Sequence, residues 1–65
     1  MDRKTEIETL TRARDTLILA ERDLRALYAE GSPLVSHCVE GLQSRAAALR
    51  VECDRLLGAM NALDS

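Results

Sequence analysis

The sequence predicts an all-α fold, an antiparallel hairpin of two long helices that pack in the manner of a coiled coil. Its apolar residues are mainly leucine and alanine, which favour helix, and only 2% of its residues are aromatic. The apolar residues recur at alternating spacings of three and four, as they do along one face of a helix. One strong helix break, Gly31-Ser32-Pro33, divides the 65 residues into halves of similar length. We therefore expect one helical domain over residues 1–65.

The first helix is expected over residues 5–30. Thr5 and Glu8 have the spacing of a capping box, in which each side chain bonds a backbone N–H at the start of the helix. Asp2 is the alternative N-cap. An apolar stripe that matches knobs-into-holes packing runs along this helix. Its members are Ile7, Leu10, Ala13, Leu17, Ala20, Leu24 and Leu27.

The turn is expected at residues 31–32. A glycine just past a helix adopts the left-handed conformation at low cost, so Gly31 is predicted to end the first helix in that conformation. Serine is a preferred N-cap and proline is favoured at the first helical position, so Ser32 and Pro33 are predicted to begin the second helix. A connection this short makes the two helices antiparallel neighbours.

The second helix is expected over residues 33–63, with two stripes. Its main apolar stripe is Val35, Val39, Leu42, Ala46, Leu49, Cys53, Leu56, Met60 and Leu63. A second stripe on the other side is mostly small or apolar: Gly41, Ser44, Ala48, Val51, Arg55, Gly58 and Ala62. Glycine inside a helix costs roughly 1 kcal/mol against alanine, so two glycines on one stripe suggest a close approach by another helix. Incidental surface residues are the alternative interpretation.

A hairpin that pairs its two main stripes leaves other apolar residues uncovered. Exposed apolar stripes usually mark an interface, so we expect the hairpin to complete a bundle by dimerising or by packing against another helical protein. Ala48 belongs to this candidate surface through the second stripe. The residues expected to be uncovered are Leu19, Tyr28, Val51 and Leu57.

The side chains that could carry chemistry do not converge. Cys38 and Cys53 are separated by about 22 Å along one helix, whereas a disulfide needs Cα atoms within about 7 Å. We expect free thiols, with a bridge between chains as the alternative. His37 and Cys38 are adjacent and point about 100° apart on a helix, which suits neither a zinc site nor a Cys–His dyad. We expect no metal, no cofactor and no enzymatic activity.

The charge pattern is balanced, with nine basic and eleven acidic residues and a net charge of −2. The best basic cluster, residues 12–25, is interrupted by Asp15, Glu21 and Asp23. Because the signs are interspersed, we do not expect binding to nucleic acid. No apolar run is long enough to span a membrane and no signal peptide is evident, so we expect no membrane insertion and a cytoplasmic location.

A Leu-Ala-Glu segment at residues 19–21 is followed by Arg22 and Arg25, by Gly31 and Pro33 of the turn, and by the pair Ala48-Leu49. In these features residues 17–60 resemble the small co-chaperones of type III secretion needle subunits, the YscE-like group. After the turn proline this chain has Leu34-Val35-Ser36, where that family often has Gln-Tyr.

The YscE-like resemblance implies a cytoplasmic bacterial chaperone, co-chaperone or assembly adaptor. Such a protein would bind a larger helical chaperone, and the two together would keep a needle subunit from polymerising early. The resemblance also implies that the second helix docks, with Leu42, Leu49, Val51 and Leu56 among the contacting residues.

The second helix carries Glu40, Leu42, Ala46, Leu49, Cys53 and Gly58, and in these it is also similar to the Rop-type RNA-binding proteins. That resemblance implies an alternative function, a homodimeric four-helix bundle that regulates by binding RNA. In that family basic, amide and aromatic groups of the first helix contact RNA. Here the corresponding surface carries Thr11, Asp15 and Leu19 and no aromatic residue, so the resemblance extends to the bundle and not to the RNA site.

Overall fold

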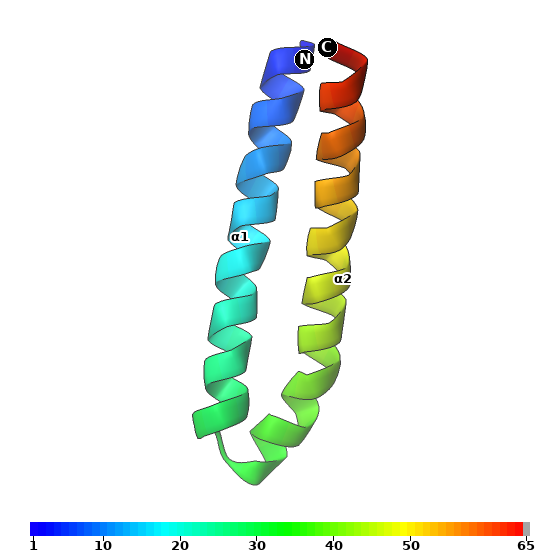
Figure 1. The fold of residues 1–65 in the computed structure, drawn as a ribbon. Helices are drawn as coiled ribbons and strands as arrows, with labels where there is room; N and C mark the ends of the chain where they lie inside the picture. The colour runs from blue at the N-terminus through cyan, green and yellow to red at the C-terminus, as the bar shows by residue number, and fades with distance from the viewer. Residues whose placement is uncertain (65) are drawn as a thin grey trace.

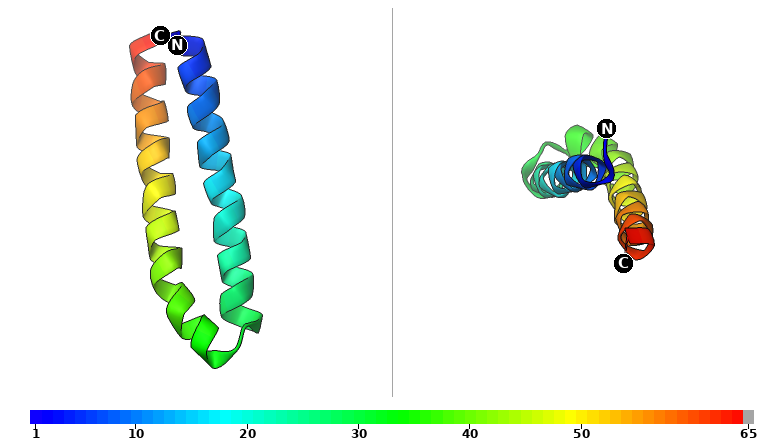
Figure 2. Two further views of the ribbon diagram at one scale, coloured as in Figure 1. Left: turned by 180° about the vertical axis from the view of Figure 1, so that it is seen from behind. Right: turned by 90° about the horizontal axis from the view of Figure 1, so that it is seen from above.

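The protein is a hairpin of two α-helices that lie side by side and run in opposite directions (Figure 1). In the structure, a computed structural model that describes residues 1–64, α1 spans Arg3–Glu30 and α2 spans Pro33–Asp64. The Cα atoms extend over 48 × 15 × 15 Å, so the molecule is one helix pair thick. Seen along the long axis, the helices are tilted relative to one another (Figure 2). The predicted all-α antiparallel hairpin is confirmed.

Helix α1 begins two residues before the predicted start, because Asp2 and not Thr5 is its N-cap. The Asp2 carboxylate accepts a hydrogen bond of 2.7 Å from the backbone N–H of Thr5. The backbone carbonyl of Asp2 also accepts a bond of 2.9 Å from the N–H of Glu6. The capping box predicted at Thr5 is therefore wrong. An aspartate three residues further upstream caps the helix equally well by the same chemistry, and it adds one negative charge at the positive end of the helix dipole.

Acid is expected to loosen the first turn of α1 through this cap. Hydrogen bonds from the side chain and then the backbone of Thr5 lower the pKa of Asp2 from its ordinary value of 3.8. Because the folded-state pKa lies below the unfolded one, the stabilisation is present above pH 3.8 and is lost as the pH falls through the folded-state pKa. Amide hydrogen exchange at Thr5, followed across acidic pH, should show the loss. The Asp2→Asn variant, which caps without titrating, should lack this pH dependence; an identical profile would contradict the assignment.

The turn differs from the prediction at one residue. Gly31 has φ −74° and ψ 167°, an extended conformation, so the predicted left-handed conformation is wrong. Glycine is needed there for space instead, because a Cβ atom at Gly31 would collide with the backbone carbonyl oxygen of Leu27 and approach Val35 Cγ1 to 3.1 Å. The predicted start of α2 is confirmed: Pro33 is its first residue, and the Ser32 hydroxyl accepts a bond of 3.4 Å from the N–H of Val35.

A second serine, Ser36, ties the end of α1 to the start of α2. Its hydroxyl lies 2.9 Å from the backbone carbonyl oxygen of Tyr28 and 3.3 Å from that of Gly31. The last carbonyl groups of a helix have no partner within the helix, so this hydroxyl satisfies groups that water would otherwise solvate. The sequence analysis did not identify this cap, because it depends on a contact across the turn.

Each helix contacts the other through one row of residues, which we name its contact line. These residues are buried or half-buried and recur at alternating spacings of three and four. The only side chains classed as buried among those described are apolar and all belong to α2: Val39, Ala46, Leu57 and Met60. Helix α1 has no fully buried residue. The contact line of α1 is Ile7, Leu10, Arg14, Leu17, Glu21 and Leu24, and Thr11 and Ala20 are half-buried at its edges. That of α2 is Val39, Gln43, Ala46, Arg50, Cys53, Leu57 and Met60.

The predicted main stripe of α2 is rotated relative to this contact line. Val39, Ala46, Cys53 and Met60 belong to both, but Leu42, Leu49 and Leu56 are about half exposed. The residue that follows each of these leucines contacts α1 in its place. Leu57 was predicted to be uncovered, and this is wrong, since only 7% of it is exposed. On α1, Ala13 and Leu27 of the predicted stripe are likewise exposed.

Candidate protein-binding face

The leucines displaced from the helix contact form a continuous apolar row on α2. Leu42, Leu49, Leu56 and Leu63 are each seven residues apart, a spacing that returns to nearly the same side of a helix. Their exposed fractions are 49%, 50%, 52% and 76%. The row is about 31 Å long, since α2 rises about 1.5 Å per residue. An exposed apolar row of this length on a small protein is the strongest candidate for a binding surface.

Three residues of α1 extend this row into a face. Ala13 and Ala20 directly precede Arg14 and Glu21 of the contact line, just as Leu49 and Leu56 directly precede Arg50 and Leu57. In an antiparallel pair, residues turned in the same sense from the two contact lines lie on the same side of the pair. Leu27, seven residues after Ala20, continues the α1 row and is 47% exposed. The leucine face, as we name it, consists of Ala13, Ala20, Leu27, Leu42, Leu49, Leu56 and Leu63.

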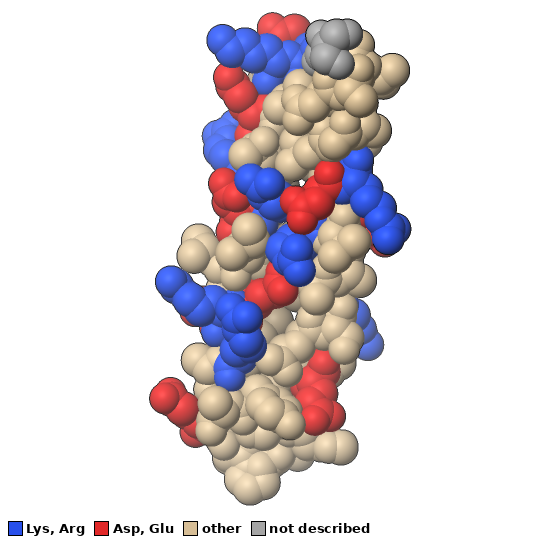
Figure 3. Space-filling view, in the orientation of Figure 1, with Lys and Arg blue, Asp and Glu red and all other residues tan. Residues whose placement is uncertain are grey.

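The opposite side of the hairpin carries ion pairs that bridge the two helices. Arg50 Nε lies 2.6 Å from Glu21 Oε1, and Arg14 Nη1 lies 3.4 Å from Asp54 Oδ1. Arg50 also reaches Asp54 at 3.3 Å, which joins both pairs into one network. Figure 3 looks onto this side, where basic and acidic groups alternate along the boundary between α1 and α2. We name Arg14, Glu21, Arg50 and Asp54 the charged face.

The electrostatics of the charged face are already satisfied within one chain. Hydrogen bonds to Asp15, and then to Asp54, raise the pKa of Arg14. Arg14 lies 3.0 Å from Asp15 and is therefore shared between two carboxylates. The side chains of Arg14, Arg50 and Asp54 keep 31%, 32% and 42% of their surface exposed and that of Glu21 keeps 18%, so water still screens these pairs and their contribution to stability is small. The ion pairs instead favour one rotation of α2 about its own axis, because they form only when Arg50, and not Leu49, faces α1.

The predicted binding residues fall into five groups in the structure. Leu42, Leu49 and Leu56 lie on the leucine face. Leu19 and Ala48 lie on the outer sides of their helices, opposite the contact lines, and Val51 follows Arg50 toward the charged face. Tyr28 is 46% exposed and lies beside the turn. Leu57 is buried between the helices and is not available to a partner of the folded hairpin.

The second stripe of α2 points away from α1. A Cβ atom added at Gly41 or Gly58 would meet nothing within 4 Å, so no other part of the described chain approaches these glycines. The predicted close approach of a helix is therefore not made within the hairpin. Ala13 and Ala20, which complete the leucine face, were both predicted in the helix contact; Ala13 is exposed, whereas Ala20 is half-buried at the edge of the contact.

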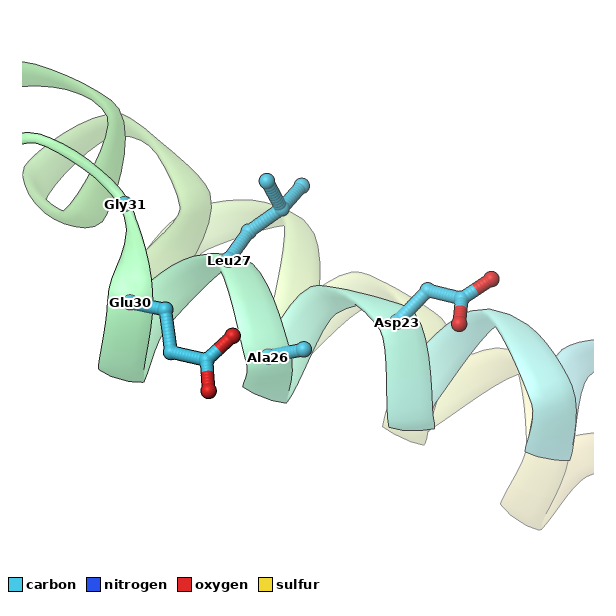
Figure 4. Close-up of a pocket in the computed structure, with 5 residues that line it drawn as sticks. All are labelled: Asp23, Ala26, Leu27, Glu30 and Gly31. Atoms are coloured by element: carbon cyan, nitrogen blue, oxygen red, sulfur yellow. The ribbon is translucent and has the colours of Figure 1, made fainter.

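A hollow at the surface lies where α1 meets the turn. This hollow, about 370 Å³, is lined by Asp23, Ala26, Leu27, Glu30 and Gly31 (Figure 4). All of these belong to the end of α1 and the turn, so it is an open depression and not a cleft between helices. Among the described side chains, no three His, Cys, Asp or Glu groups lie together as a metal site would require.

The remaining reactive groups are dispersed. Cys38 is exposed and Cys53 is half-buried, and both are free thiols. His37 is exposed. Within residues 1–64, neither helix has a segment of the length and hydropathy needed to cross a membrane. No protein family, no curated protein and no solved structure matches this chain.

Proposed function

We propose that this protein acts without catalysis, by binding a helical protein along the leucine face. The observation that carries the proposal is the exposed row of leucines at a seven-residue spacing, together with the alanines beside it. A helix with its own apolar stripe would insert side chains between these leucines, as helices do in a bundle. Such a protein serves as a small chaperone, co-chaperone or assembly adaptor, because its binding covers apolar surface on a partner.

The finer part of the proposal concerns the pathway. The resemblance of residues 17–60 to the YscE-like group supports a cytoplasmic bacterial co-chaperone of a type III secretion needle system. Three of the contact residues implied by that resemblance, Leu42, Leu49 and Leu56, belong to the leucine face. The needle-subunit chaperones of that family are helical, which is the kind of partner that the leucine face suits.

A Rop-type RNA-binding function has less support. Arg14, an arginine of the basic cluster, is held by Asp15 and by Asp54 of α2. The charged face alternates in sign, whereas contacts to phosphates need a net basic surface. The homodimer of that alternative would form through the leucine face.

Binding of a labelled amphipathic peptide tests the proposed function. The peptide carries leucine and alanine at heptad spacing, and its binding is followed by fluorescence anisotropy. We expect wild-type protein to bind it and Leu49→Glu to lose at least about tenfold in affinity, because burying one leucine stabilises a complex by about 1.5–3 kcal/mol.

Val51→Glu is the matched control, two residues away on the same helix and also exposed. It should bind the peptide like the wild type, because Val51 lies outside the leucine face. Equal losses for the two variants would contradict binding through the leucine face. If the wild type bound neither the peptide nor itself, protein binding as the function of this chain would be refuted.

A further inference from the structure

We infer that a second copy of this chain occupies the leucine face, with the two hairpin turns at the same end of the resulting four-helix bundle. The inference rests on the proposed function, because it names the partner of the same surface, and any other helix, including the test peptide, binds there only in competition with the second copy. Three observations carry it: the surface area of the hairpin, the arrangement of large and small residues on the leucine face, and the ion pairs on the other side.

The surface area of the hairpin is larger than its mass requires. It exposes 4842 Å². A compact monomer of 7.2 kDa exposes about 4100 Å². The surplus of about 700 Å² is close to the roughly 800 Å² that each partner contributes to a stable protein–protein interface. Burying an area equal to this surplus on each of two copies would therefore meet the area that a stable dimer needs.

A leucine of α2 lies beside an alanine of α1 at the two central levels of the leucine face, whereas Leu42 and Leu27 near the turn are both large. Arg50 and Glu21 form the ion pair between helices at 2.6 Å. Leu49 and Ala20 each precede one of them, so they lie within about 3 Å of one level along the antiparallel helices. One heptad along in each antiparallel helix, Leu56 is level with Ala13. Each leucine of α2 at these two levels thus has an alanine of α1 beside it.

A twofold axis along the hairpin uses this alternation. It places Leu49 of one copy over Ala20 of the other and Ala20 over Leu49, and it does the same for Leu56 and Ala13. Large side chains that face small ones interdigitate, so the two faces are complementary to themselves. With the turns at opposite ends, leucines would face leucines along one side and alanines would face alanines along the other, which packs less evenly.

The charged face determines which side remains outward. Its two arginines already pair with carboxylates of the same chain. Burying these groups in an interface would remove water from them without supplying better partners. The leucine face contains no charged residue among its members, so it is the side that loses least on contact with an identical surface.

Sedimentation equilibrium under reducing conditions tests the partner. We expect the wild type to be a dimer at low micromolar concentration. Leu49→Glu should weaken dimerisation by about 100-fold or more, because the dimer contains the substitution twice at the centre of its interface. Val51→Glu should dimerise like the wild type. Leu49→Ala, which adds no charge and has high helix propensity, should keep its helicity and still dimerise more weakly.

The orientation is tested by spin labels on Cys38 in a Cys53→Ala background. With the turns at one end, the two α2 axes lie diagonally across the bundle, about 15 Å apart. With the turns at opposite ends, the labels would be more than about 30 Å apart, since Cys38 is near one end of α2. The expected result is the short distance in the dimer.

Each outcome separates this inference from the proposed function. A monomer at hundreds of micromolar that binds the amphipathic peptide would overturn the second copy as partner and leave the proposed function standing. A monomer that does not bind the peptide would overturn both. A dimer that tolerates Leu49→Glu and Leu49→Ala, or one with the long separation between labels, would overturn the inference as stated.

Discussion

Replacing Leu57 by aspartate is expected to unfold the hairpin. Leu57 is 7% exposed in the contact between α1 and α2. Truncating a buried leucine costs about 2–5 kcal/mol, and the aspartate adds a charge without a partner. The core of a chain this small supplies only about 3–5 kcal/mol, so the loss is comparable to the whole stability. Far-ultraviolet circular dichroism should show a large loss of helicity.

The adjacent residue provides the matched control for this prediction. Leu56 is 52% exposed, so Leu56→Asp leaves its charge in contact with water in a single hairpin. At a concentration where neither variant associates, Leu56→Asp should keep more helicity and a higher unfolding midpoint than Leu57→Asp. The same two substitutions should rank in the opposite order for peptide binding by whatever folded protein remains, because Leu56 belongs to the leucine face.

The comparison of Leu56 and Leu57 decides the rotation of α2. The heptad pattern alone places Leu56 in the helix contact and Leu57 outside it, which is the reverse of the structure. A greater loss of helicity for Leu56→Asp than for Leu57→Asp would therefore reject the observed rotation and favour the one expected from the sequence.

Alanine substitutions at the glycines are expected to have opposite signs. Gly31→Ala should destabilise the hairpin by about 1–3 kcal/mol, because the new Cβ atom collides with the carbonyl of Leu27 and the backbone must shift. Gly58→Ala should stabilise it by about 0.5–1 kcal/mol, because open space surrounds the new methyl group and alanine favours helix. Thermal unfolding should shift by about 4–8 °C per kcal/mol in a chain of this size.

The two glycines serve as controls for each other. Both substitutions add one methyl group, so a general effect of added apolar surface would move both midpoints in the same direction. Gly41→Ala, also in open space inside α2, should behave like Gly58→Ala. A stabilising Gly31→Ala would contradict the steric role of this glycine, and a destabilising Gly58→Ala would point to a close neighbour at that position.

The sequence singled out many residues of the candidate surface, but it did not predict which side of the hairpin they occupy. Leu42, Leu49 and Leu56 stand out from their spacing, but the pattern placed them between the helices. Ala13 and Ala20 look like contact residues for the same reason. Leu19, Ala48 and Val51 were predicted as binding residues because they fall outside the main stripes, and the structure places them away from the leucine face.

The sequence by itself determined the hairpin, through effects that act within a few residues. Ser32 and Pro33 begin a helix, Gly31 ends one, and the short turn between them forces the helices to run antiparallel. At the start of α1 two residues could serve as the N-cap. The capping-box spacing favoured Thr5, but Asp2 caps the helix.

The rotation of α2 about its own axis was decided only by the tertiary structure. A heptad repeat defines an apolar stripe about 100° wide, and neighbouring residues such as Leu56 and Leu57 lie about 100° apart around the helix. Two rotations of α2 would therefore each place apolar residues against α1. A single pair of helices can adopt only one of these rotations, so it buries Leu56 or Leu57 but not both. The Glu21–Arg50 and Arg14–Asp54 pairs form with one rotation, which buries Leu57 and leaves Leu42, Leu49 and Leu56 exposed.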